Sequence, residues 1–249
     1  MVKGMEKFRE YFADYREQYV LIGGAACDIL FTENNSDFRA TRDLDIVLVV
    51  EALTKEFGDL FWKFINDGEY QNRTKNNSKP QFYRFDKPTK NGFPQVLELF
   101  AKTDIILTED KTLTPIHIDD SVSSLSAILL DDDYYEIMLK GRIIVKDISI
   151  LKSTYLIPFK AKAWLDLQEK KKQGKHVDSR DIKKHKNDII RITSEMSLER
   201  DCEFPDTVKN DMELFIEMLQ NETTDMKNLK LSNVSIEDIV ALLKEIYCR

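Results

Sequence analysis

The chain has 249 residues, of which 42% are hydrophobic and 33% charged, and its formal net charge is −7. This composition is typical of a folded protein with a sizeable core, and it excludes collagen-like, linker-rich and largely disordered chains. The negative net charge also disfavours a protein that coats itself with nucleic acid through overall positive charge.

The N-terminal part of the chain mixes helical and strand patterns, and its polar, turn-rich segment 72–80 is predicted to be a loop. In chain order, we predict a helix over 3–16, a strand over 19–22, a helix over 25–31, a strand over 44–50, a helix over 54–66, and strands over 81–85 and 95–100.

The pattern changes towards the C-terminus. Residues 112–145 are expected to form short strands and turns, with an acidic turn at Asp131 to Asp133. Further along, we predict four helices, over 157–172, 178–196, 205–220 and 235–247. The sequence therefore predicts an α/β (α+β) domain over 1–150, with a mixed sheet flanked by helices, and a helical C-terminal domain over 151–249.

The glycine pair Gly23-Gly24 lies between a predicted strand and a predicted helix. Such a turn lets a phosphate approach the backbone closely, and the helix N-terminus offers unpaired N–H groups and the positive end of a dipole. The same residues also suit a tight packing turn, which is the commoner use of two glycines before a helix.

Two acidic residues, Asp43 and Asp45, are two apart at the start of the predicted strand 44–50, so their side chains point to the same face. Neighbouring carboxylates repel one another unless a cation lies between them, and oxygen ligands of this kind suit Mg²⁺ or Mn²⁺. The alternative interpretation is a solvated strand end.

Glu98 stands among apolar residues in the segment Val96 to Phe100. A buried carboxylate is costly unless it is protonated, paired with a cation or bound to a metal. Three carboxylates on neighbouring strands, beside a glycine turn, are the arrangement expected of a two-metal phosphoryl-transfer site.

These residues together resemble the pattern of the polymerase-β-like nucleotidyltransferase superfamily. Within it, the chain is most similar to the AbiEii/AbiGii group, which is associated with abortive infection and toxin–antitoxin systems. That group carries an Arg-x-Ser/Thr-x-Asp-x-Asp element, which is matched here by Arg39, Thr41, Asp43 and Asp45. The resemblance covers roughly residues 19–190, and it implies a nucleotidyltransferase fold.

The resemblance also assigns roles to the N-terminal residues. Asp43, Asp45 and Glu98 would be the catalytic acids and the metal ligands. The residues implied in nucleotide binding are Gly23, Gly24, Thr41, Arg42 and Lys160, with Arg39 as a secondary candidate.

The C-terminal motifs are looser matches. A Lys-x-x-Ala element begins at Lys160, and the group's basic-Asp pair is matched by Arg180-Asp181. Lys162 is an alternative to Lys160, since the two point about 200° apart on one helix and only one can face a nucleotide. The acid that usually follows three residues after the pair is replaced here by a lysine, and Asp188 lies on the same helix face as Asp181.

The activity that the resemblance implies is transfer of a nucleoside monophosphate from an NTP to an acceptor, either RNA such as tRNA or a protein, with Mg²⁺ or Mn²⁺ as cofactor. It further implies the toxin of a toxin–antitoxin pair, with an antitoxin protein as partner. Two alternatives stay open: a non-catalytic nucleotide-sensing or partner-binding module of the same fold, and a γ-phosphotransferase. The lysine-rich segment 170–186 is either a seat for RNA or a solvated helix face.

The remaining features favour a cytoplasmic protein without membrane contact. No apolar run approaches the ~18 residues that span a bilayer, and the charged N-terminal segment does not resemble a signal peptide. The three cysteines, Cys27, Cys202 and Cys248, have no metal-site spacing, and we expect no disulfide partner for them.

Overall fold

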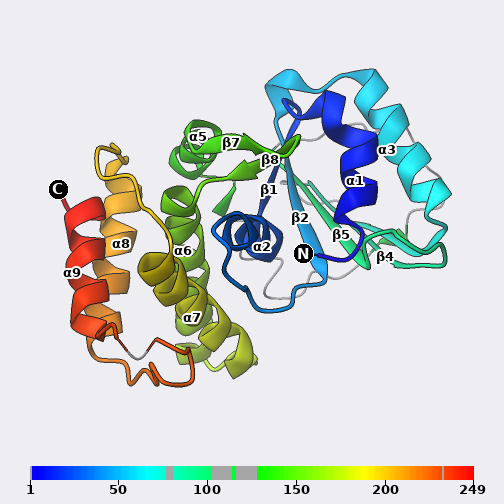
Figure 1. The fold of residues 1–249 in the computed structure, drawn as a ribbon. Coiled ribbons are helices and arrows are strands. Elements are labelled where there is room, and N and C mark those ends of the chain that lie inside the picture. The colour runs from blue at the N-terminus through cyan, green and yellow to red at the C-terminus, as the bar shows by residue number, and fades with distance from the viewer. Residues whose placement is uncertain (1, 77–80, 103–113, 116–127, 130, 232) are drawn as a thin grey trace. The chain divides into compact units, whose positions relative to one another are not determined.

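The structure, a computed structural model, describes residues 2–76, 81–102, 114–115, 128–129, 131–231 and 233–249. It is α+β, with a mixed sheet flanked by helices, as the sequence predicts (Figure 1). The chain divides into two compact units. The first, which we call the sheet unit, comprises Met1–Asp119 and Met138–Lys152, and the second, the helical unit, comprises Asp120–Ile137 and Ser153–Arg249.

The predicted boundary at residue 150 therefore lies close to the point at which the chain enters the long helical segment. The helical unit also takes in 120–137, which the sequence analysis assigns to the first domain. None of the helices within the described ranges combines the length and apolar character that a bilayer span requires.

Among the described residues, eight strands form the sheet, in the order β6-β3-β4-β5-β2-β1-β8-β7. They are β1 Tyr19–Ile22, β2 Asp43–Leu48, β3 Tyr70–Asn76, β4 Gln81–Pro88, β5 Val96–Ala101, β6 Thr114–Pro115, β7 Arg142–Val145 and β8 Ile148–Leu151. The helices are α1 Met5–Phe12, α2 Gly23–Glu33, α3 Lys55–Asp67, α5 Asp132–Lys140, α6 Ser153–Lys172, α7 Ser179–Glu195, α8 Asp206–Gln220 and α9 Ile236–Tyr247, with short 3₁₀ turns at Ala13–Tyr15 and Val50–Ala52.

One face of the central strands is apolar because alternate residues are large hydrophobics. Leu44 on β2 pairs with Leu97 on β5, which pairs in turn with Phe85 on β4. Helices α1 and α3 lie side by side on this face (Figure 1), and the ring of Phe61 on α3 lies 5.6 Å from that of Phe85. Each fully buried aromatic side chain of this layer contributes roughly 1.5–3 kcal/mol to the stability of the fold.

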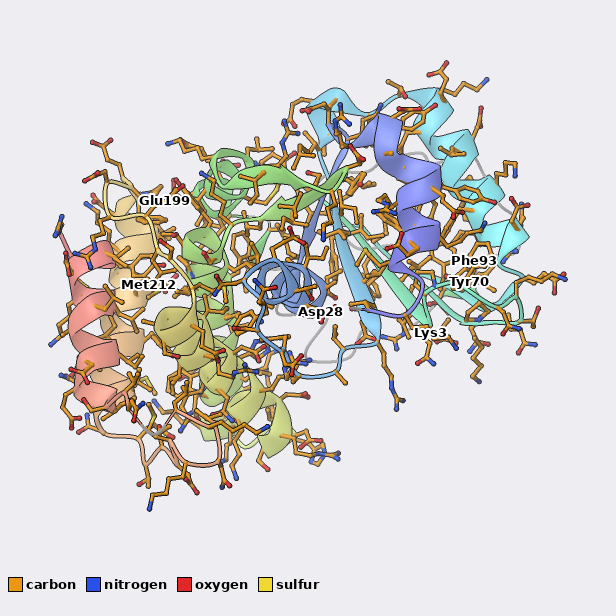
Figure 2. All side chains as sticks on the ribbon, in the orientation of Figure 1. Lys3, Asp28, Tyr70, Phe93, Glu199 and Met212 are labelled. Carbon is orange, nitrogen blue, oxygen red and sulfur yellow. The ribbon has the colours of Figure 1, made fainter. Side chains whose placement is uncertain are left out.

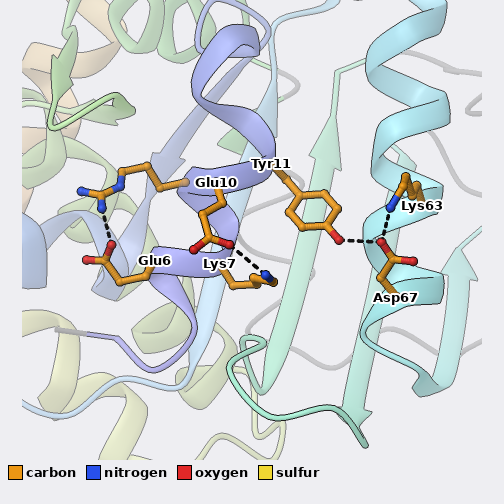
Figure 3. A network of polar contacts seen from close by, with 7 residues as sticks. Glu6, Lys7, Glu10, Tyr11, Lys63 and Asp67 are labelled. Atoms are coloured by element: carbon orange, nitrogen blue, oxygen red, sulfur yellow. Dashed lines mark hydrogen bonds and ion pairs between the residues drawn. The ribbon is translucent and has the colours of Figure 1, made fainter.

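Polar side chains on the outer surfaces of α1 and α3 bind one another (Figure 3). The Tyr11 hydroxyl donates a hydrogen bond of 2.5 Å to Asp67, which also pairs with Lys63, and Lys7 lies 2.8 Å from Glu10. The two lysines of this network are thus matched by acids.

The opposite face of the same strands is polar at one end. Asp45 on β2 lies between Ile22 on β1 and Glu98 on β5, and Glu98 is in turn the register partner of Arg84 on β4. Since register partners point to the same face, these charged side chains form one row across the sheet. Helix α2 lies on this side (Figure 1).

Helix α6 of the helical unit contains a proline, and the backbone hydrogen bond that this proline cannot form is replaced by a bond from another helix. Pro158 has no N–H to donate to the carbonyl of Thr154, four residues earlier. The hydroxyl of Tyr247, at the end of α9, donates to that carbonyl instead, at 2.6 Å. The backbone N–H of Glu199 binds the Thr154 side chain at 2.9 Å, so segments distant in sequence meet at one turn of α6.

Two sequence predictions are wrong. Residues 72–76 belong to strand β3 rather than to a loop, because each pairs with a residue of β4. The segment from Asp131 opens helix α5 rather than a turn, since the Asp131 carboxylate accepts hydrogen bonds from the backbone N–H groups of Asp133 and Tyr134, at 2.9 and 3.3 Å. The predicted strands and turns over 112–127 lie mostly outside the described residues.

Candidate functional site

The structure brings two of the three predicted acids together on the polar face of the sheet. Asp45 and Glu98 are register partners on the parallel strands β2 and β5, although they lie far apart in sequence. Asp43 pairs with Val96 in the next row of the same face. The three carboxyl groups thus lie within two neighbouring rows, near enough for Asp43 and Asp45 to influence the ionisation of Glu98.

The glycine pair packs directly against these residues. Gly23 has a φ of +64°, and a Cβ atom added there would lie 1.9 Å from the Asp45 carboxylate oxygen Oδ2. A Cβ on Gly24 would lie 2.6 Å from the Thr41 hydroxyl. Contacts shorter than 3 Å would force the Asp45 and Thr41 side chains to move, and at Gly23 the left-handed backbone conformation independently favours glycine.

Gly23 and Gly24 are also the first residues of helix α2. The residue before them, Ile22, contributes no side-chain cap, so no side chain at this position satisfies the first N–H groups of the helix. A helix end of this kind favours an anion.

Glu98 is 7% exposed and forms an ion pair with the half-exposed guanidinium of Arg84 on β4. Burial, together with the negative charge of Asp45, raises the pKa of Glu98 to about 8, while Arg84 acts in the opposite direction. A side-chain hydrogen bond to Asp45 also favours the protonated form of Glu98. Within the described ranges, the buried Glu98 carboxyl therefore pairs with one arginine and lies near two further acids.

Sequence analysis missed Arg84. It lies in the segment Phe82-Tyr83-Arg84-Phe85, where it interrupts an apolar strand as Glu98 does in its own. Two strands that each carry one charged residue among hydrophobics give a signal for a cross-strand ion pair once their antiparallel pairing is assumed.

The basic residues near the acids have different positions. The guanidinium of Arg39 lies over the ring of Phe38, 5.1 Å from its centroid, in the connection between α2 and β2. Arg42, directly before Asp43, is exposed and lines a cavity in the sheet unit. Arg42 is therefore adjacent to the acid row, but it forms no ion pair with any residue in the described part of the chain.

The C-terminal candidates lie in the helical unit, and the structure shows what each one contacts there. Lys160 on α6 is 4% exposed, and its Nζ lies 2.7 Å from Asp188 Oδ2 on α7. Lys162 points to other neighbours, with its Nζ 3.1 Å from Asp211 on α8, which also accepts a hydrogen bond from Tyr134. The divergence expected of the two lysines is observed, and nucleotide contact by either stays a prediction.

Arg180 and Asp181 open helix α7. The Arg180 side chain is 90% exposed and pairs with Asp178, the N-cap residue, at 2.7 Å. Asp181 is half-buried in the first helical turn. Among the basic residues of segment 170–186, Lys186 is buried and paired with Glu222 at 2.8 Å, so this lysine is not part of a solvated face.

The carboxylates of Asp43, Asp45 and Glu98 form an oxygen donor set of the type that Mg²⁺ or Mn²⁺ prefers. In the described part of the chain, no three His, Cys, Asp or Glu side chains have the spacing of a formed metal centre. The closeness of Asp45 raises the pKa of Glu98, which favours a proton on Glu98 when no cation is bound.

Comparison of this sequence with protein-family models gives no match, and comparison with curated proteins finds no relative.

Proposed function

We propose that this chain is a metal-dependent nucleotidyltransferase of the polymerase-β-like superfamily, similar to the AbiEii/AbiGii group. It would transfer a nucleoside monophosphate from an NTP to an acceptor, RNA such as tRNA or a protein, as the toxin of a toxin–antitoxin pair. The observation that carries this proposal is the contact of Gly23 with Asp45, which is itself the register partner of Glu98. A phosphate-binding turn and two carboxylates thereby share one place on the sheet.

In this proposal, the first N–H groups of α2 hold the phosphates of the nucleotide, next to Gly23 and Gly24. Asp43, Asp45 and Glu98 would hold Mg²⁺ or Mn²⁺, which when bound supplies positive charge to the phosphates and lowers the pKa of the acceptor hydroxyl. Arg84 positions Glu98 through their ion pair.

The acceptor oxygen forms a bond to the α-phosphorus, the bond from that phosphorus to the bridging oxygen breaks, and pyrophosphate leaves. The hydroxyl proton passes to a carboxylate of the site.

The test uses purified protein with Mg²⁺ or Mn²⁺, total RNA, and each α-³²P-labelled NTP in turn. Label should enter RNA or protein with the wild-type chain, and the double variant Asp43→Ala/Asp45→Ala should reduce incorporation by about 10³-fold or more, since a metal-bound phosphate interaction is worth several kcal/mol. The exposed residues Asp14 and Asp59 provide a matched control, Asp14→Ala/Asp59→Ala, with the same loss of charge in the same unit. Equal incorporation by both double variants would contradict the proposal.

One observation favours a second candidate, a non-catalytic nucleotide-binding module. The Arg84 guanidinium already provides Glu98 with a cation. Under this alternative, NTP binds without any transfer of label. Transfer of label from γ-³²P-NTP, and not from α-³²P-NTP, would instead identify a γ-phosphotransferase.

A further inference from the structure

A cavity of about 430 Å³ opens in the sheet unit, beside the acid row. Its walls come from the ends of β4 and β5, from the turn that joins these strands and from the N-terminal segment. Lys3 and Phe93, which both line it, lie near the N-terminal end of α1 (Figure 2). The volume is within the range of pockets that bind small ligands or parts of larger ones.

The lining of this cavity is strongly cationic. It contains Lys3, Arg42, Lys87 and Lys90 but only one acid, Asp86. That acid is already engaged, because Asn72 donates a hydrogen bond of 2.6 Å to it and Arg84 lies 3.6 Å away. In a chain with a net charge of −7, such a local excess of cations needs an explanation.

Most of these cations also lack acidic neighbours. Lys90 lies 3.0 Å from Glu69, but Lys3, Arg42 and Lys87 form no ion pair with any residue in the ranges that the structure describes. Two exposed lysines, Lys7 on α1 and Lys63 on α3, behave differently, since they are matched by Glu10 and Asp67 (Figure 3). An anion bound in the cavity would supply the negative charge that the described residues do not provide.

The walls of the cavity are fixed by contacts of their own. The turn after β4 is tied to the end of α3 by hydrogen bonds from the N–H groups of Thr89 and Lys90, at 3.4 and 3.3 Å. The buried Tyr70 hydroxyl donates 2.7 Å to the Pro94 carbonyl. Gly4 packs so closely on this segment that an added Cβ would lie 2.2 Å from the Pro94 nitrogen. The backbone of these walls is therefore held in place, which lowers the part of the entropic cost of binding that comes from ordering the chain.

The cavity and the diglycine turn lie on opposite sides of the acids. In the strand order β4-β5-β2-β1, the acids occupy β5 and β2, the diglycine follows β1, and the cavity lies at the end of β4. Val96 connects the cavity with the acid row, because it lines the cavity and pairs with Asp43. Two ligands approaching from these two sides would meet at the carboxylates.

We propose that this cavity is a second anion site, which binds a phosphate group of the acceptor while the diglycine turn holds the donor nucleotide. Its position as an acceptor site rests on the proposed function, whereas its affinity for phosphate does not. The phosphate can belong to a polynucleotide or to a small phosphorylated molecule, and four cations around 430 Å³ fit either source.

The test measures binding directly, by fluorescence anisotropy of a labelled RNA hexanucleotide in EDTA at low salt. The double variant Arg42→Gln/Lys87→Gln should weaken binding about tenfold and reduce the salt slope by roughly 1.4, since each phosphate contact on a single strand contributes about 0.7. The matched control, Lys7→Gln/Lys63→Gln, removes equal charge from the same unit and should bind as the wild type does. Both cavity residues are exposed, and circular dichroism verifies that the variants are folded.

Competition identifies the source of the phosphate. If the hexanucleotide is displaced by unlabelled RNA but not by inorganic pyrophosphate at the same phosphate concentration, the ligand is a polynucleotide; displacement by pyrophosphate identifies a small phosphorylated molecule. Unchanged binding in the cavity variant overturns the inference, as does a loss of affinity that is instead caused by Lys171→Gln/Lys172→Gln in the lysine-rich segment. If NMP transfer is absent while the cavity variant still loses binding, the proposed function fails and the phosphate site stands.

Discussion

Each unit of this molecule holds a buried carboxylate beside a basic side chain, and the two arrangements differ in their charge balance. In the helical unit, Asp188 faces Lys160, and both side chains are almost completely buried. In the sheet unit, Glu98 is also buried, but Arg84 is half-exposed and two more acids lie nearby. The first arrangement is a matched pair, whereas the second, counted over the residues that the structure describes, places three acids beside one arginine.

This difference separates a structural feature from a candidate site. In a matched buried pair the two charges neutralise each other, so the pair does not require a ligand. Removing one partner nevertheless lowers the free energy of unfolding strongly. Three acids with one arginine are stable together only if a proton or a cation reduces their repulsion. Burial of charge alone therefore does not indicate function, but an unbalanced buried charge does.

The largest effect should come from breaking the matched pair. Lys160→Met leaves Asp188 buried without this lysine and should lower the free energy of unfolding of the helical unit by about 3–5 kcal/mol. The double variant Lys160→Met/Asp188→Leu should recover most of that loss. Urea unfolding in a Trp62→Phe background measures it, because Trp164 on α6 is fully buried and is then the remaining tryptophan.

A Lys160→Met variant as stable as the wild type would show that the pair is not the structural element described here. A double variant no more stable than the single one would show that packing, rather than the unbalanced charge, causes the loss.

The next effect is a dependence of stability on pH that is expected for Glu98. Glu98 has a pKa of about 8 in the folded chain against 4.5 as an ordinary glutamate, so the folded state keeps a proton that the unfolded state releases. Stability of the sheet unit in EDTA should therefore fall as the pH rises from about 4.5 to 8. Glu98→Gln should remove this fall and exceed the wild type at pH 8 by on the order of 2 kcal/mol.

Trp62 reports on this unit in a Trp164→Phe background, by urea unfolding at a series of pH values. Glu56→Gln, at an exposed position of α3, is the control and should retain the wild-type pH dependence. The charge imbalance is contradicted if Glu98→Gln shows the same fall between pH 5 and 8 as the wild type.

A smaller effect on stability, but a large one on the site, is expected at Gly23. Gly23→Ala places a methyl group against Asp45 in a left-handed backbone conformation, so we expect a loss of about 1–2 kcal/mol together with the loss of NMP transfer. Gly174 is the matched control, because its φ of +76° is similar and no atom lies within 4 Å of an added Cβ. Gly174→Ala should lose a similar amount of stability but keep NMP transfer. If both variants lose stability and transfer to the same extent, the contact between the glycine turn and Asp45 is not needed for transfer.

The smallest effect is expected at the exposed pair in the helical unit. Arg180 pairs with Asp178 in full contact with solvent, and the N-cap hydrogen bond to the helix is made by Asp178 itself. Arg180→Ala should leave the urea midpoint of the helical unit unchanged, since exposed ion pairs contribute little. A clear shift of the midpoint would show that the exposed pair contributes to stability as the buried pair Lys160–Asp188 does, which would contradict the comparison.

The features that sequence reasoning predicted are those set by local pattern. Strand β1 has its predicted bounds, and helix α9, which a capping box of Ser235 and Asp238 opens, falls within the predicted range 235–247. The failures have non-local causes. Segment 72–76 is polar and resembles a loop, yet pairing with β4 supplies its backbone hydrogen bonds. Helix α5 depends on a cap from Asp131, in an acidic run that by composition indicates a turn.

The candidate site likewise has a part that the sequence predicts and a part that depends on tertiary structure. The identities of Asp43, Asp45 and Glu98 stand out in the sequence, but their register across β2 and β5 depends on the pairing of distant strands. The ion pair of Lys160 with Asp188 also could not be predicted, because helical periodicity places each residue on a helix face but does not show which element packs against that face.

The proline in α6 has a consequence for the order in which the chain folds as it is made. The Thr154 carbonyl receives its hydrogen bond from Tyr247, 93 residues later. At a synthesis rate of 5–20 residues per second, the helical unit waits roughly 5–20 s before that bond can form. The strands that the structure describes in the sheet unit all end by residue 151, so this unit can fold while the helical unit is still being translated. A ribosome-stalled chain ending before residue 247 would thus be expected to present a finished sheet beside an unfinished bundle.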